Sequence, residues 1–92
     1  MLARTVTIRN ALGMHARAAA RFVHAAGAFQ CRISVTREDR DDRHVDGKSI
    51  LGLLLLAAAR GVDIRITADG TDEAEALGAL CRLVEAGFGE EP

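Results

Sequence analysis

The chain has 92 residues, a length that suits a single domain (1–92) with one modest hydrophobic core. Its 12 basic and 13 acidic residues nearly cancel, which leaves a formal net charge of −1, and its only aromatic residues are three phenylalanines. This composition argues against binding nucleic acid, which favours basic surfaces and stacked aromatic rings, and against binding an anionic membrane.

Cys31 and Cys81 lie far apart and have no metal-ligand spacing, so we expect two buried free thiols in a reducing cytosol. No cofactor or metal is expected. The longest apolar run, 53–59, is shorter than the ~18 residues that a membrane-spanning helix needs. The N-terminus contains no apolar block typical of a signal peptide. We therefore predict a cytoplasmic protein without membrane insertion.

The chain begins with a predicted strand and helix. Val6 and Ile8 alternate with polar neighbours at the period of a half-buried strand over 5–9. From His15 the spacing becomes helical, and Gly27 indicates where this helix ends. The apolar stripe of the helix comprises Ala18, Ala19, Phe22, Val23 and Ala26.

Alternation over 31–36 predicts a second strand. The charged run 37–43 indicates a solvent-exposed hairpin tip, and a short return strand is expected over 44–47. Ser49 is expected to cap a short apolar helix that runs to about Leu56.

Alternation over 62–67 predicts a strand that ends at 69–70, and Thr71 or Asp72 is expected to cap the last helix. Each strand has one apolar face, so we predict an α+β fold of order β-α-β-β-α-β-α. It is an open-faced two-layer sandwich whose mostly antiparallel sheet is covered by helices on one side. The apolar stripe of the last helix comprises Ala74, Leu77, Leu80, Cys81, Val84 and Phe88.

His15 stands where the first helix is expected to begin. The free N–H groups of a first turn, at the positive end of the helix dipole, can hold a phosphate or another anion. The same field disfavours a charged imidazole, so we expect a neutral ring whose free lone pair can act as a nucleophile. Arg17 could pair with a phosphoryl group, and Gly13 would let a partner come close.

A competing interpretation is that His15 is an ordinary exposed residue, because lone surface histidines are common. We find in the sequence no second acid or base to act with it, no set of metal ligands and no phosphate-binding glycine loop. A complete enzyme is therefore not expected. His24 and His44 have no partner at ligand spacing and are interpreted as surface residues.

Three segments, LGMHARAAARF, DGKSILGLLLLAAARG and ITADGTDEAEAL, together resemble the HPr family of histidine-containing phosphocarriers of the bacterial phosphotransferase system. The resemblance covers nearly the whole chain and implies four antiparallel strands with three helices on one face. It also implies that His15 accepts a phosphoryl group on Nδ1 from phospho-enzyme I, which phosphoenolpyruvate charges. Arg17 would steady this group until a IIA component of a sugar permease receives it.

The resemblance further implies that Ser49 is a regulatory phosphorylation site for an HPr kinase/phosphorylase. The competing interpretation is an ordinary N-cap, since serine is preferred there. A phosphate at a helix start would add negative charge to the docking surface without melting the helix. Ile50, Leu51 and Leu54 match the exposed apolar patch of the family that binds partners. The alternative is that these three residues pack in the core, because the apolar residues of this helix cannot all be exposed. The neighbouring leucines are Leu53, Leu55 and Leu56.

Two features depart from the family pattern or leave a choice open. Ala18 replaces the usual proline, which predicts a slightly looser site that still works, and the charged hairpin tip is longer than usual. Ser49 after Lys48 favours the sugar branch of the family, whereas the C-terminal AGFGEEP favours the nitrogen-related branch. A rival function is a regulatory interaction domain of the same fold acting through Ser49. A small-molecule-binding domain has weaker support, and a monomer is expected.

Overall fold

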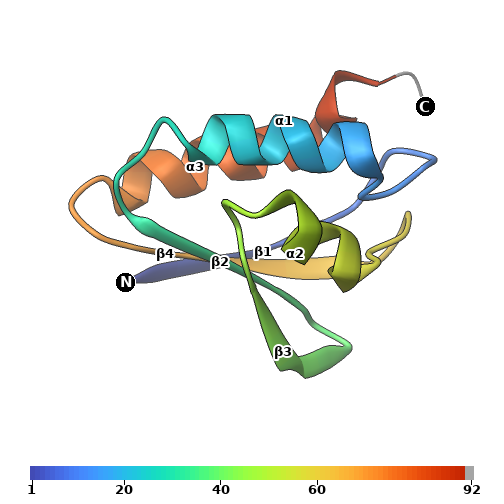
Figure 1. The fold of residues 1–92 in the computed structure, drawn as a ribbon, viewed down its shortest axis with the longest axis horizontal. Helices are drawn as coiled ribbons and strands as arrows, with labels where there is room; N and C mark the ends of the chain where they lie inside the picture. The colour runs from blue at the N-terminus through green and yellow to red at the C-terminus, as the bar shows by residue number, and fades with distance from the viewer. Residues whose placement is uncertain (91–92) are drawn as a thin grey trace.

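The chain folds into two layers, a four-stranded sheet and helices that cover one of its faces (Figure 1). The computed structural model describes residues 1–90, with all their side chains except those of 41 and 42. This arrangement confirms the predicted open-faced α+β sandwich and its order of elements. In chain order these are β1 (Leu2–Thr7), α1 (Ala16–Ala26), β2 (Arg32–Arg37), β3 (Arg40–Asp46), α2 (Ile50–Leu56), β4 (Asp63–Asp69), α3 (Glu73–Glu85) and a 3₁₀ turn, η1 (Gly87–Gly89).

The sheet has the strand order β1-β4-β2-β3, and each neighbouring pair is antiparallel. Val6 pairs with Ile64 across β1 and β4, and Val35 pairs with Ile66 across β2 and β4. All four side chains are buried beneath the helices. The period-two alternation in the sequence therefore gives the sheet one apolar face, and the helices cover that face.

The core lies between the sheet and the helices, and Phe22 and Phe88 are its largest buried side chains. The predicted stripe of α1 is confirmed, since its three alanines and Phe22 are buried and Val23 is partly buried. Cys31 and Cys81 are buried free thiols, as expected. Figure 1 shows that η1, which follows α3, lies beside the first turn of α1, and this segment shapes the site described below.

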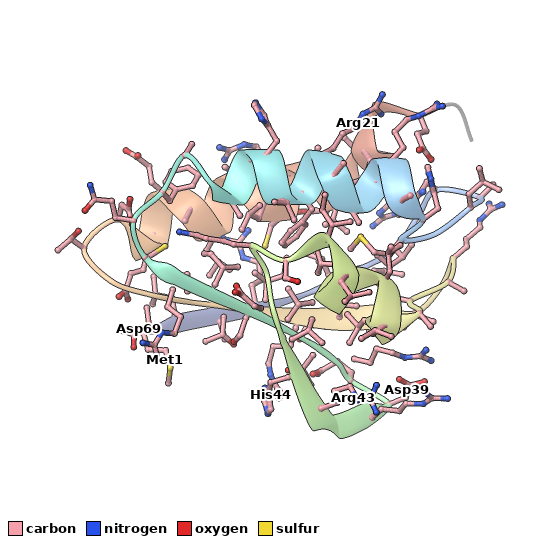
Figure 2. The ribbon with its side chains drawn as sticks, viewed as in Figure 1. Met1, Arg21, Asp39, Arg43, His44 and Asp69 are labelled. Carbon is pink, nitrogen blue, oxygen red and sulfur yellow. The ribbon has the colours of Figure 1, made fainter. Side chains whose placement is uncertain are left out.

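The first strand and the charged hairpin differ from the sequence prediction. β1 begins at Leu2, and β3 begins at Arg40, so the predicted tip over 37–43 shrinks to a turn at Glu38 and Asp39. β3 is an edge strand, where charged side chains can extend into solvent without leaving the ladder. A register shift after Thr36 accommodates the extra residues of β3. In Figure 2, Asp39 and Arg43 lie at the outer end of this hairpin, away from α1.

The last helix also differs in detail. Asp72 precedes α3 as predicted, but its carboxylate makes no capping hydrogen bond. It accepts instead from the backbone N–H groups of Gln30 at 2.8 Å and Cys31 at 3.0 Å, which ties α3 to the start of β2. Ala74 is exposed, so its place in the predicted stripe was wrong. Phe88 reaches the core from η1 rather than from α3, because the helix ends three residues earlier.

Candidate functional site

His15 is the N-cap residue of α1. Its backbone is extended, and its Nδ1 accepts the backbone N–H of Arg17 at 3.3 Å. The imidazole thus occupies the place that serine or aspartate usually fills at a helix start. The side chain is 26% exposed. His15 therefore caps the helix and still presents its ring to a partner.

The loop that carries His15 is pressed against the linker after α2. Gly13 has φ +66°, and a Cβ there would lie 2.7 Å from the Ala58 carbonyl oxygen and 2.9 Å from Ala59 Cα. The next residue, Met14, is buried and donates its N–H to the same Ala58 carbonyl at 2.9 Å. The backbone that comes close to Gly13 is thus that of Ala58 and Ala59. Only glycine fits both the conformation and the space.

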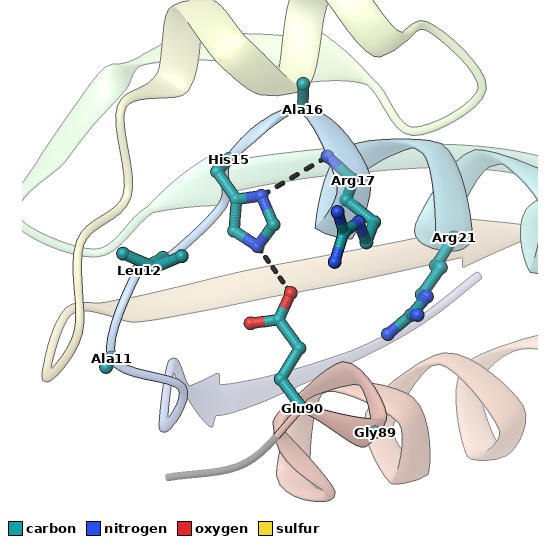
Figure 3. A pocket seen from close by; sticks show the side chains of 8 residues that line it. All are labelled: Ala11, Leu12, His15, Ala16, Arg17, Arg21, Gly89 and Glu90. Carbon is teal, nitrogen blue, oxygen red and sulfur yellow. Dashed lines mark hydrogen bonds and ion pairs between the residues drawn. The ribbon is translucent and has the colours of Figure 1, made fainter.

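An open hollow of about 600 Å³ lies beside the imidazole, and Figure 3 shows the side chains that line it. Arg17 and Arg21 stand one turn apart on α1, and Figure 3 shows both guanidinium groups extending toward the C-terminal segment. Together with the free N–H groups of the first turn, they favour an anion in this hollow. Its lining residues are Ala11, Leu12, His15, Ala16, Arg17, Arg21, Gly89 and Glu90.

Glu90 brings a carboxylate to the imidazole. One oxygen contacts His15 Nε2, and the other accepts from Asn10 Nδ2 at 2.9 Å. The Asn10 hydrogen bond, followed by the smaller effect of His15, holds the pKa of the Glu90 carboxyl below its usual range. The expectation that no second acid accompanies His15 was therefore wrong. His15 and Glu90 are 75 positions apart. The only feature of the sequence that could have indicated this contact is the presence of an acidic residue directly after GFG.

The first residues of α2 are placed as predicted. The Ser49 hydroxyl caps the helix by accepting the N–H of Gly52 at 3.0 Å. Ile50, Leu51 and Leu54 are 42%, 66% and 37% exposed, so they form a surface and not a core. Of the leucines left undecided, Leu53 and Leu56 are buried and Leu55 is exposed. α2 packs against α1, the helix that His15 caps.

The remaining candidate residues lie apart from this site. His24 and His44 are exposed, as expected. Among the described side chains, those of residues 1–40 and 43–90, no three of histidine, cysteine, aspartate or glutamate are placed to hold a metal ion. None of the helices in that part of the chain is long and apolar enough to cross a membrane.

Comparison with known proteins identifies the family. The family model "PTS HPr component phosphorylation site" matches residues 2–86. The chain belongs to the HPr family. The HPr of Neisseria meningitidis is 47% identical over 90 residues, which cover 98% of each chain. Membership confirms the resemblance seen in the sequence and makes the chain a phosphocarrier.

Solved structures of HPr agree with the fold. A crystal structure of HPr from Thermoanaerobacter tengcongensis superposes with a TM-score of 0.92 at 41% identity and covers all of both chains. A second structure, of an HPr dimer from the same organism, has a TM-score of 0.74 at 41% identity and covers 98% of this chain and 100% of that one. A dimer is thus known for a relative, and the monomer expected for this HPr-family chain stays a prediction.

Proposed function

We propose that this HPr-family chain carries a phosphoryl group on His15. It receives the group from phospho-enzyme I and passes it to IIA components of sugar permeases in the cytoplasm. The observation that carries this proposal is the placement of a partly exposed imidazole at the N-terminus of α1, with Arg17 and Arg21 lining the same hollow. This site combines a nucleophile with groups that neutralise a phosphoryl dianion.

Transfer begins when the Nδ1 lone pair of His15 attacks the phosphorus of the donor. A nitrogen–phosphorus bond forms, and the bond between phosphorus and the donor's leaving atom breaks, its electron pair staying with the donor. The Arg17 N–H, held by Nδ1 at a long 3.3 Å, then becomes available to a phosphoryl oxygen. The Arg17 guanidinium adds charge-assisted hydrogen bonds. Transfer to a IIA component is the same exchange run in the opposite direction.

The test is the intact mass of the protein after incubation with phosphoenolpyruvate and a bacterial enzyme I. We expect the mass of one added phosphoryl group, which mild acid removes and which the variant His15→Ala lacks. His24→Ala, which removes an exposed histidine of the same helix, is the matched control and should load normally. Normal loading of His15→Ala would contradict the assignment.

We also propose that Ile50, Leu51 and Leu54 form the docking surface and that Ser49 regulates it. Ser49 precedes the exposed residues of α2 and accepts a hydrogen bond through its hydroxyl oxygen. A phosphate there keeps acceptors for the helix N–H groups while placing negative charge beside the apolar surface. Incubation with an HPr kinase/phosphorylase and ATP should modify the wild type and Ser34→Ala but not Ser49→Ala.

The sugar and nitrogen-related branches differ in which IIA component accepts the group. We propose the sugar branch because Ser49 follows Lys48, a pair typical of a kinase-regulated carrier. Loaded protein should transfer its label to a IIA component of a sugar permease faster than to a nitrogen-related IIA component. The opposite preference would assign the chain to the other branch.

A further inference from the structure

Given the proposed role of His15 as acceptor, we propose that Glu90 is a positioning residue that fixes the tautomer and the orientation of the imidazole. Its carboxylate holds the proton on Nε2, which leaves the Nδ1 lone pair free for the incoming phosphorus. Glu90 does not touch the phosphoryl group in this arrangement. It acts through His15.

The hydrogen-bond partners of the ring allow only one neutral tautomer. The backbone N–H of Arg17 can only donate, so the Nδ1 of His15 must accept. The ionised carboxylate of Glu90 can only accept, so Nε2 must carry the hydrogen. With Nδ1 protonated instead, both contacts would be repulsive.

Asn10 holds Glu90 in place. The side chain of Asn10 is buried, and its Nδ2 donates to the Gly13 carbonyl at 2.7 Å as well as to Glu90 Oε1 at 2.9 Å. These two bonds tie the carboxylate to the loop that carries His15. Asn10 Oδ1 is buried and has no hydrogen-bond partner among the described residues, a cost in stability. The position of the Asn10 side chain is therefore explained by the two hydrogen bonds that its Nδ2 donates, and not by hydrophobic packing.

The backbone after α3 is bent to deliver Glu90. Gly87, Phe88 and Gly89 have φ values of +65°, +57° and +76°, so three successive residues adopt the left-handed conformation. A bulky residue such as Phe88 rarely takes this conformation, and the surrounding structure must impose it. Its ring is buried in the core, and its carbonyl accepts a hydrogen bond from Arg21 Nη1. The turn is thus anchored on both sides before it reaches Glu90.

The charges around the imidazole divide into two roles. Arg21 is engaged by the Phe88 carbonyl, and Glu90 is engaged by His15 and Asn10. The guanidinium of Arg17 lines the hollow, and among the described side chains it makes no hydrogen bond or ion pair, since only the backbone N–H of Arg17 is engaged, by His15. Glu90 therefore binds the ring and leaves Arg17 available for the phosphoryl group. After transfer Nε2 still bears its hydrogen, so the same contact holds the ring in the loaded state.

The first experiment measures the tautomer of His15 by ¹⁵N NMR of the labelled imidazole at mildly alkaline pH. We expect wild-type His15 to show a protonated Nε2 and an unprotonated Nδ1. Glu90→Gln replaces a pure acceptor with a group that can also donate, so both tautomers should appear. Glu85→Gln, the same change at an exposed acid of α3, is the matched control and should match the wild type.

The second experiment measures the rate of phosphoryl acceptance from phospho-enzyme I, with a thermal melt to confirm folding. Glu90→Gln should lower the rate about tenfold, a typical effect of losing a partner that orients a functional histidine, and Glu85→Gln should leave it unchanged. An unchanged tautomer, or an unchanged or faster rate in Glu90→Gln, would overturn the role of Glu90. A wild-type chain that accepts no phosphoryl group would instead refute the proposed function, whatever the tautomer result.

Discussion

The guanidinium of Arg37, at the end of β2, donates a hydrogen bond at 3.0 Å to the carbonyl of Ala57, the C-cap residue that follows α2. A longer bond reaches the Leu56 carbonyl at 3.4 Å, and two further bonds bind Asp39. Carbonyls at a helix C-terminus lack intrahelical partners, and a cation there is favourable. Arg37 therefore stabilises the end of the helix that presents the proposed docking surface.

Replacing Arg37 tests this cap. Arg37→Met keeps much of the stem but removes the bonds to α2, so we expect a loss of about 1 kcal/mol in the free energy of unfolding. Urea denaturation measures this loss, and hydrogen exchange should show faster opening in α2. Arg40→Met, at an exposed position of β3, is the control and should change stability little. Equal stability of the two variants would show that the cap contributes nothing.

Ala57 adopts φ +53°, a left-handed conformation that L-alanine disfavours. Ala57→Gly should relieve this strain and raise the free energy of unfolding by about 0.5–1 kcal/mol, even though glycine increases the entropy of the unfolded chain. Ala59→Gly is the control, because Ala59 has no positive φ and should only lose stability. A thermal melt in which both variants lose stability equally would contradict this assignment of strain.

Gly13 is predicted to be irreplaceable because of both conformation and space. Gly13→Ala combines a positive φ with a Cβ 2.7 Å from the Ala58 carbonyl oxygen, so the loop before His15 must shift. Gly61→Ala also has a positive φ, +88°, but its Cβ would meet no atom within 4 Å. We expect Gly61→Ala to cost about 1 kcal/mol and Gly13→Ala at least ~1 kcal/mol more. Only Gly13→Ala should slow phosphoryl acceptance, and equal effects of the two changes would argue against a collision.

Asp72 makes stability depend on pH. The backbone N–H of Gln30 is the main cause that lowers the pKa of the Asp72 carboxyl from its ordinary 3.8, and Cys31 adds to it. A carboxyl with a lowered pKa stabilises the fold above its unfolded pKa, and this contribution is lost as pH falls through the folded pKa. Asp72→Asn should therefore lower stability at pH 7, and the difference from the wild type should shrink as pH falls below 3.8.

Urea denaturation at a series of pH values measures this convergence. Glu75→Gln removes an exposed acid from the first turn of the same helix and is the control. Its difference from the wild type should be smaller at neutral pH than that of Asp72→Asn. A gap between Asp72→Asn and the wild type that stays constant with pH would show that the ionised carboxylate is not what ties α3 to β2.

Features set by neighbours along the chain could be predicted from the sequence. Ser49 caps α2, Gly27 follows the last residue of α1, and Phe22 lies on the buried stripe of α1. Hydrophobic periodicity and helix capping depend on residues within a few positions of one another, so they can be predicted before the tertiary structure is known. The placement of His15 at a helix start belongs to this class, and it was enough to indicate an anion-compatible site.

Features set by contacts between distant segments were decided only by the tertiary structure. Nothing near Glu90 in the chain indicates that its carboxylate meets His15, because that contact depends on how the last turn crosses α1. The local sequence also does not show that β3 lies at the edge of the sheet. This edge position allows a charged residue, Arg40, to begin the strand, because its side chain can extend into solvent. Similarly, Leu55 is exposed and Leu53 buried because of the face that α2 turns to the core. The sequence alone predicted the helices, the strands and the place of His15 at a helix start. Only the tertiary structure showed that Glu90 accompanies it, because a contact across 75 residues depends on the topology of the whole domain.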